Sequence, residues 1–239
     1  MVIRQELEEL LSGGGGGGCV DGGDAASGAA APAASGAAAP ATSAAAVPAA
    51  SGTAAAPSDG FSVYRSPVVA RGSWSDFQLY AHCRRNEAHC ARCPRTAAVL
   101  AAQPSLNTMA FGAHFFSRLT GGTHLAAHCG PSNLRLRVHL GLIVPPGTRI
   151  RCGDQTREWK EGECLVFDDS FEHEVWHEGA ADRIVLIADM YHPDVDLEAM
   201  VLPLLGPEQR ADLAAAQRGE HTALTARGYS TGEVVAVQR

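Results

Sequence analysis

The sequence predicts a mainly β fold, a sandwich or barrel of short strands with flanking helices. From Met109 onward, apolar runs rich in β-branched and aromatic residues follow at close intervals, and turns such as GGT, PPG and KEG separate them. That rhythm of short strands and tight turns is typical of sandwiches and barrels. The expected strands are MAFGAHFFSRL, RLRVHLGLIV, RIRCG, ECLVF, FEHEVWH and RIVLIADMYH.

The first quarter of the chain has a different composition. Ala, Gly, Pro and Ser dominate residues 12–57, where GGGGGG is followed by repeats such as AAAPAASGAAAP. Such a segment offers too little apolar side-chain area to offset the backbone entropy lost on folding. We therefore expect residues 1–57 to be a disordered low-complexity region, in which IRQELEELL forms a lone helical turn or two.

The remaining length, about 180 residues, suits one catalytic domain with one core. The composition changes from Phe61, and PRTAAVLAAQP predicts a short helix because it has a proline start and an alanine-rich interior. We place this domain at residues 58–205. Residues 206–239 are predicted to be a helical tail, since the helical pattern near the C-terminus breaks at Gly206 and Pro207.

Charge and hydropathy argue against two classes of partner. The net charge is −7 and the 19 basic residues are scattered, which argues against binding to a nucleic-acid backbone. No stretch approaches about eighteen consecutive apolar residues, and the acidic N-terminus lacks the features of a signal peptide. The chain as written is expected to be soluble, although a misplaced start codon would remove a membrane anchor without trace, so its location stays open.

The 7 cysteines are odd in number, so at least one is unpaired within the chain. Cys83, Cys90 and Cys93 lie close together beside His82 and His89, a spacing that fits a disulfide, free thiols or zinc. A second pair of zinc ligands is missing. The pattern therefore favours a disulfide or free thiols.

Side chains alternate between the two faces of a strand, and two expected strands are informative in this respect. In LRLRVHLGL, one face is made by leucines and Val138, and the other carries Arg135, Arg137 and His139. The first face belongs in a core, and the second faces solvent or a site. The run that follows Arg183 is apolar on both faces, so we expect it to be buried on both sides, with an anionic partner for Arg183.

Two histidines differ from the rest in position. His128 lies in the turn-forming sequence AAHCGPSN, and His173 lies at the centre of a later expected strand, with Phe171 and Val175 on its face. Histidines on two antiparallel strands are how a double-stranded β-helix, a jelly-roll barrel, holds a non-haem iron. The carboxylate that usually follows two residues after the first histidine is replaced by Gly130.

A 2-oxo acid would compensate for the missing carboxylate. It supplies two oxygen ligands to the metal and leaves two positions for water or dioxygen. Arg183, ten residues after His173, would then hold the distal carboxylate through a bidentate pair.

The acidic residues around His173 have two readings. Asp168 and Asp169 fit a turn with Ser170. Alternatively, Asp169 accepts a hydrogen bond from an iron-bound water and replaces the missing carboxylate ligand in that role.

The neighbouring ionisable residues are expected to play lesser parts. Glu172 and Glu174 fall on the opposite face from His173 and should be structural or solvated. His177 shares the face of His173 but lies further out, so it is more often a structural residue than a ligand. His192 is expected to be a packed or capping residue.

From about Phe116 to Val195 the chain resembles the aspartyl/asparaginyl β-hydroxylase family of Fe(II)- and 2-oxoglutarate-dependent oxygenases. WSDFQLY and CARCPRTAAVL resemble the lead-in to that domain. In this family glycine takes the place of the carboxylate ligand, as Gly130 does here. The resemblance implies a cupin-like jelly roll with flanking helices. It rests on FSRLTGGTHLAAHCGPSNLRLRVHLGLIVPPGTRIRCG and GECLVFDDSFEHEVWHEGAADRIVLIADMYHPDV.

The resemblance also implies roles for individual residues. Iron is held by His128 and His173. Arg183 pairs with the C5 carboxylate of 2-oxoglutarate, and Ser117 and His139 make further polar contacts with it. The implied reaction couples oxidative decarboxylation of 2-oxoglutarate by dioxygen to hydroxylation of an unactivated C–H bond, and yields succinate and carbon dioxide.

The family name implies hydroxylation of the β-carbon of aspartyl or asparaginyl residues in a protein, with EGF-like domains as the substrate class to test. Arg137 is similar to a residue that engages a substrate or oxo acid carboxylate, and the basic face of Arg135, Arg137 and His139 suits an acidic substrate. Similar motifs occur in hydroxylases of lipid acyl chains and of small amino acids, and a non-catalytic jelly-roll binding module is a further alternative. Family members are often anchored in the endoplasmic reticulum membrane.

Overall fold

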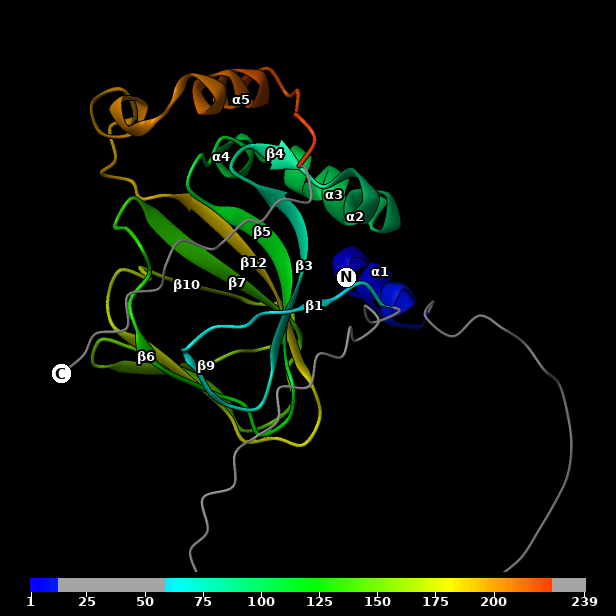
Figure 1. Cartoon of the computed structure of the whole chain (residues 1–239). Coiled ribbons are helices and arrows are strands. Elements are labelled where there is room, and N and C mark those ends of the chain that lie inside the picture. Colours follow the sequence, from blue (N-terminus) through cyan, green and yellow to red (C-terminus); the bar gives the residue numbers. More distant parts are fainter. Residues whose placement is uncertain (13–58, 225–239) are drawn as a thin grey trace, which may run out of the picture. The chain divides into compact units, whose positions relative to one another are not determined.

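The computed structural model describes residues 1–12 and 59–224, which form two antiparallel sheets with helices beside one of them (Figure 1). In order across the sheet, sheet A contains β1 (Ser62–Val63), β3 (Trp74–Ala81), β5 (Ala113–Leu119), β12 (Arg183–Tyr191), β7 (Arg135–Ile143) and β10 (Cys164–Phe167), and β4 (Arg84–Arg85) pairs with β3. Sheet B contains β2 (Val69–Arg71), β6 (His124–His128), β11 (His173–His177), β8 (Thr148–Cys152) and β9 (Gln155–Glu158).

The order of the strands defines the architecture. From β5 onward the chain passes back and forth between the sheets, so that β5, β7, β10 and β12 lie in sheet A while β6, β8, β9 and β11 lie in sheet B. Strand β12, the last in sequence, is inserted between β5 and β7. This arrangement is the double-stranded β-helix, a jelly roll, and confirms the predicted fold class.

Every run expected to be a strand contains one, but the strands before β5, and β6 and β9, were not predicted. The sequence placed His128 in a turn, whereas it is the last residue of β6. The segment HLAAH is rich in alanine, which has a low β propensity, and its strand conformation comes from pairing with β11 and β2.

Two hydrophobic clusters hold sheet A between them. An inner cluster contains side chains from both sheets, such as Phe115, Val175 and Ile187, and therefore fills the barrel. An outer cluster contains Ile184 and Leu186 with helix residues and lies on the other face of sheet A. Strand β12 is thus buried on both faces, as predicted.

The helices follow the sequence pattern in most places. The expected helix is α3 (Pro94–Ala101), which follows α2 (Glu87–Arg92) and precedes α4 (Pro104–Asn107). Near the C-terminus, η2 (Leu197–Val201) and η3 (Leu202–Leu204) lead to α5 (Pro207–Gln217). The predicted break is confirmed, because Gly206 is the N-cap of α5.

Helix α5 is more than a tail. Its Leu213 and Ala216 pack in one cluster with Cys83, Ala110 and Val201. It therefore belongs to the same folded unit as the barrel. The rest of the predicted tail, residues 225–239, lies outside the described residues.

The N-terminus corrects the prediction for residues 1–57. Residues Val2–Ser12 form an eleven-residue helix, α1, rather than a lone turn, and Ile3, Leu7 and Leu10 of this helix belong to the outer cluster. Their spacing gives an apolar stripe on one helix face. The predicted disordered segment after α1 falls within residues 13–58, outside the described part of the chain.

The cysteines near α2 are free thiols. Cys83, Cys90 and Cys93 are buried and unpaired, and burial raises the pKa of Cys83 and Cys93 to about 12. Within residues 1–12 and 59–224, no three His, Cys, Asp or Glu side chains are grouped so that they could hold a metal ion. Thiols with such raised pKa values are poor nucleophiles.

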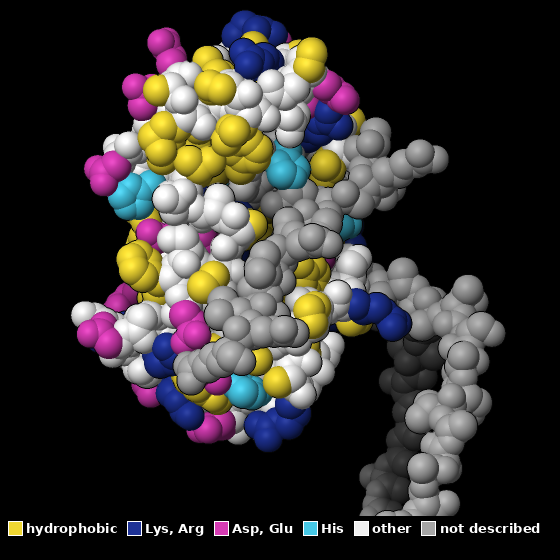
Figure 2. Space-filling view, turned by 60° about the vertical axis from the view of Figure 1, so that its left-hand side comes forward, with side chains coloured by type: hydrophobic (Ala, Val, Ile, Leu, Met, Phe, Trp, Pro, Cys, Tyr) yellow, Lys and Arg dark blue, Asp and Glu magenta, His cyan; other side chains and the backbone are white. Residues whose placement is uncertain are grey.

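The surface carries both signs of charge. On the face shown in Figure 2, acidic and basic side chains are interspersed. No helix in the described part of the chain is long and apolar enough to cross a membrane.

Candidate metal centre

His128 and His173 lie opposite each other on neighbouring strands. The register of β6 and β11 pairs the two residues directly, and the centroids of their rings are 4.1 Å apart. His173 is the first residue of β11, not its centre as the sequence suggested. Phe171 precedes the strand and is 61% exposed, so it does not share the buried face of His173.

Both imidazoles are prepared to bind a metal through Nε2. His128 Nδ1 donates to the carbonyl of Ala126 at 2.7 Å, and His173 Nδ1 donates to the carbonyl of Phe171 at 3.0 Å. These bonds place the proton on Nδ1 and leave the Nε2 lone pair for a metal. Burial lowers the pKa of both rings, that of His173 to about 4, so both are neutral at physiological pH.

Asp169 lies beside this pair in the space next to Gly130. A Cβ on Gly130 would lie 2.5 Å from Asp169 Oδ2, and the Gly130 N–H donates to the Asp169 carbonyl at 2.5 Å. Gly130 is the residue two positions after His128, where many iron sites have a carboxylate ligand. The Asp169 carboxylate therefore occupies the volume that a side chain at position 130 would fill.

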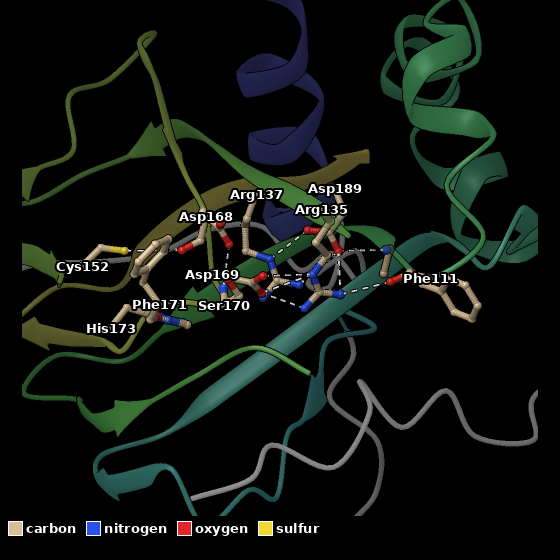
Figure 3. Close-up of polar contacts among 11 residues, drawn as sticks. Phe111, Arg135, Arg137, Cys152, Asp168, Asp169, Ser170, Phe171, His173 and Asp189 are labelled. Atoms are coloured by element: carbon tan, nitrogen blue, oxygen red, sulfur yellow. Dashed lines mark hydrogen bonds and ion pairs between the residues drawn. The ribbon is translucent and has the colours of Figure 1, made fainter. Parts of the chain in front are cut away.

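Two aspartates and two arginines form a buried network next to His173 (Figure 3). Arg135 Nη2 lies 2.7 Å from Asp169 Oδ2, and Arg137 contacts Asp189 through Nε at 2.8 Å and Nη2 at 3.0 Å. Cross-contacts of 3.4 Å join Arg135 to Asp189 and Arg137 to Asp169. Asp169 lies in a turn with Ser170, as the first interpretation expected, but its carboxylate is buried and is held in place by Arg135.

Asp189 was missed in the sequence analysis. It is fully buried, which alone would raise its pKa, but Arg137 and Arg135 lower it well below the usual range. A lone aspartate inside an apolar strand was the available signal, because a buried carboxylate requires a charged partner.

The network also corrects the interpretation of the basic strand face. Arg135 is buried against Asp169, and Arg137 is held by Asp189. The two positive charges are matched by two negative ones, so the face does not present a net positive surface to an acidic substrate.

Arg183 lies in the barrel without a partner for part of its guanidinium. It is 2% exposed, and its Nε and Nη1 atoms have no hydrogen-bond partner among residues 1–12 and 59–224. Its Cζ lies 4.9 Å from the centroid of the Trp159 ring, which offers only a weak attraction. Burial lowers the pKa of Arg183 to about 9, which leaves it charged at neutral pH.

His139 presents a second donor without a partner. Its Nδ1 accepts a hydrogen bond from Trp159 Nε1 at 3.2 Å, which places the ring proton on Nε2, and this buried atom has no partner in the described part of the chain. Burial first, and Arg183 second, hold the pKa of His139 well below its usual value. Ser117 Oγ accepts from Trp74 Nε1 at 3.1 Å, so its own hydroxyl proton is free to be donated.

These side chains line one narrow cavity. Its volume is about 30 Å³, so a ligand larger than a few atoms has to displace side chains at its mouth. A larger cleft of about 570 Å³ adjoins it between β9 and β10, and Ile150 and Phe167 line both spaces. The narrow cavity is lined by residues that include Ser117, His128, Arg137, His139, His173 and Arg183.

A sequence profile described as aspartyl/asparaginyl beta-hydroxylase matches residues 44–193, more than half of the chain. The chain belongs to this family. The human aspartyl/asparaginyl beta-hydroxylase is 42% identical over 146 residues, which make up 61% of this chain and 18% of the human protein. The mouse aspartate beta-hydroxylase domain-containing protein 1 is 42% identical over 136 residues, 54% of this chain and 37% of that protein. The chain thus spans only a minor part of either relative.

Solved structures with a similar arrangement are distant. A predicted oxalate decarboxylase from Thermotoga maritima is 10% identical and covers 55% of this chain and 92% of its own, with a TM-score of 0.36. A cupin 2 conserved barrel domain protein from Rhodopseudomonas palustris is 10% identical and covers 58% and 75%, with a TM-score of 0.34. The jelly-roll assignment rests on the strand order and not on these scores.

Glu172 and Glu174 of this β-hydroxylase family member lie away from the cavity. Glu172 and Glu174 pair with Arg151 at 2.9 and 3.2 Å. Glu174 also contacts His124 at 2.8 Å. They make ion pairs outside the barrel core, as expected for the opposite face.

His177 and His192 have structural contacts. His177 Nε2 donates to the carbonyl of Ala181 at 2.6 Å, and its Nδ1 accepts from the Thr148 hydroxyl at 2.9 Å. His192 Nδ1 accepts from the Asp194 N–H at 3.2 Å. His177 stabilises the turn before β12, and His192 caps the turn after it.

Proposed function

We propose that this protein is an Fe(II)- and 2-oxoglutarate-dependent dioxygenase that hydroxylates the β-carbon of aspartyl or asparaginyl residues in a protein substrate. One observation carries the proposal. Two imidazoles with available Nε2 atoms share a cavity with a buried arginine that lacks a full set of partners.

The metal part of the proposal rests on His128, His173 and Asp169. The two neutral imidazoles supply nitrogen ligands of the kind that suit Fe(II), and their Nδ1 bonds fix the ring orientations. Asp169 is positioned to accept a hydrogen bond from a water on the metal, in place of a direct carboxylate ligand. The hydrogen bond from Arg135 orients Asp169 for that role.

The oxo acid part rests on Arg183, His139 and Ser117. A buried guanidinium without a partner is costly, and a carboxylate bound to Nε and Nη1 would remove that cost. His139 Nε2–H and the Ser117 hydroxyl lie in the same cavity and provide further donors. This set of donors fits the distal carboxylate of 2-oxoglutarate. When bound, iron and 2-oxoglutarate together supply the dioxygen chemistry that breaks the C–H bond.

The surrounding residues determine access. The inner cluster closes the barrel with apolar side chains such as Leu125, Val175 and Ile187, which limit water near the reacting atoms. The cleft between β9 and β10 reaches Ile150 and Phe167 and gives a peptide side chain a route toward the histidines.

The substrate assignment comes from the relatives, which are named for hydroxylation of aspartyl and asparaginyl residues. Because Arg135 and Arg137 are paired with Asp169 and Asp189, their charges do not favour an acidic substrate over a neutral one. Asparaginyl and aspartyl peptides should therefore be tested side by side.

The proposal is tested by turnover. The protein is incubated with Fe(II), 2-oxoglutarate and a panel of disulfide-bonded EGF-like peptides that contain Asp or Asn. We expect succinate to form together with a peptide that gains one oxygen atom, as seen by mass spectrometry, and neither product with His173→Ala. Equal succinate formation by His173→Ala would contradict the ligand assignment. No succinate with any peptide, and no peptide oxidation, would contradict the proposed activity.

A further inference from the structure

Helix α1 is docked on the outer face of sheet A (blue in Figure 1). Ile3, Leu7 and Leu10 are buried, and Leu7 is completely inaccessible to solvent. They pack with residues of α3 and with the outward-facing side chains of β5, β7 and β12. None of the α1 side chains belongs to the inner cluster that fills the barrel. The barrel core is therefore complete without α1.

A single buried carboxylate gives this docking its specificity. Glu6 is 3% exposed and accepts hydrogen bonds from the backbone N–H of Arg95 at 2.8 Å and of Thr96 at 2.6 Å. These N–H groups lie in the first turn of α3, after Pro94, which has no N–H. The N-cap of α3, Cys93, makes no side-chain cap bond, so Glu6 caps the helix from another part of the chain.

Ion pairs at the rim fix the orientation of α1. Arg4 contacts Glu161 in the loop before β10, and Glu9 contacts Arg95 at 2.8 Å. Such exposed pairs add little energy but favour one direction of the helix over the reverse. The surface thus selects for apolar residues at three positions and a carboxylate at a fourth.

The docking surface and the candidate metal centre lie on opposite faces of sheet A. Phe116 and Ile184 of the outer cluster are the sequence neighbours of Ser117 and Arg183, which face the cavity. Because α1 packs against these strands from outside, its docking also restricts the positions of Ser117 and Arg183 on the cavity side.

We propose that the outer face of sheet A and the first turn of α3 form a separable docking site for an amphipathic helix of the pattern Ile-x-x-Glu-Leu-x-x-Leu, for which α1 is the ligand. Residues 13–58, rich in Ala, Gly and Pro, join α1 to the rest of the chain. The partner that fits this surface is a helix that presents the same four side chains.

The test uses the full chain with a protease recognition sequence inserted between Gly15 and Gly16, within residues 13–58. After cleavage we expect the fragment that contains α1 to remain bound during gel filtration. A labelled synthetic peptide of residues 1–14 should then exchange with it, and the remaining domain should keep its folded circular dichroism spectrum throughout.

Matched peptides test the carboxylate. A Glu6→Gln peptide should bind at least about tenfold more weakly, because hydrogen bonds to a charged acceptor are stronger than those to a neutral one. A Glu8→Gln peptide is the control, since the exposed Glu8 pairs with Arg4 of the same helix, and it should bind as the unmodified peptide does.

Three results would overturn the proposal. The fragment could leave at once on cleavage and fail to rebind, the cleaved chain could unfold, or the Glu6→Gln peptide could bind as tightly as the unmodified one. None of these results depends on iron, an oxo acid or turnover, so they are separate from the proposed activity.

Discussion

Gly130 and Asp169 compete for the same volume, since a Cβ on Gly130 would come within 2.5 Å of the Asp169 carboxylate. Because Gly130 has no side chain, the Asp169 carboxylate can occupy this space, where a hydrogen bond from Arg135 holds it. The carboxylate remains beside the histidines but belongs to a different residue from the usual ligand.

A Gly130→Ala substitution should lower the free energy of unfolding by roughly 1–3 kcal/mol, the usual cost of overpacking a buried site. Urea denaturation measures this change. The effect should shrink in an Asp169→Ala background, where the space is open, so the two changes should be non-additive in a double-mutant cycle. Additive effects would show that the two side chains do not compete.

Arg183→Met should leave the protein without ligands at least as stable as the original, because the substitution removes a buried charge that has no full set of partners. Thermal denaturation measures this. The rise in melting temperature on addition of 2-oxoglutarate should disappear in the variant. Arg149→Met, at an exposed arginine paired with Glu178, is the control and should keep that rise. A variant that is still protected by 2-oxoglutarate would contradict the role of Arg183.

His128→Ala should weaken Fe(II) binding by more than about 100-fold, because one of two nitrogen ligands is lost and disruption of even the supporting contacts of a metal site costs 10–100-fold. Anaerobic calorimetry with Fe(II) measures the affinity. His124→Ala is the matched control, since His124 lies on the same strand but pairs with Glu174 outside the barrel. Similar losses in both variants would refute the assignment of His128.

Asp189→Asn should destabilise the fold by about 3–5 kcal/mol, because it leaves Arg137 buried without its main counter-charge. Chemical denaturation with urea gives the value. A loss below about 1 kcal/mol would mean that the network does not depend on this carboxylate.

The docking of α1 should weaken in acid. Burial alone would raise the pKa of Glu6, but the hydrogen bonds from Thr96 and Arg95 hold it below its ordinary value of 4.5. A lowered folded-state pKa contributes stability that is fully present above the unfolded value and is lost as the pH falls through the folded value. The difference in melting temperature between the original chain and Glu6→Gln should therefore be largest above the ordinary glutamate pKa of 4.5 and shrink as the pH falls through the lowered pKa of Glu6. A difference that is constant over this range would exclude a role for the charge.

The parts of the fold with a strong local pattern were predictable. Strand β12 carries apolar residues on both faces, which predicted its burial on both sides. His173 and Arg183 lie at or near the starts of two successive strands, so they could be recognised from their positions in the sequence alone. Strand β6 has a weak pattern, because HLAAH becomes a strand only through pairing with β2 and β11.

The buried charge network was not predictable for a related reason. Asp189 lies opposite Arg137 only because β12 pairs with β7 in one particular register. A shift of one residue would turn the aspartate to the other face. Likewise, the role of Glu6 could not be predicted, because its carboxylate accepts a hydrogen bond from Thr96 of α3, which lies far away in the sequence.

An anaerobic titration with Fe(II), with and without 2-oxoglutarate, tests the central claim most directly. We expect a visible charge-transfer absorption band only when both are present, and no band with His173→Ala. If the band is absent from the original protein, and 2-oxoglutarate does not raise its melting temperature in the presence of Fe(II), the site does not hold the metal and oxo acid together and the account is wrong.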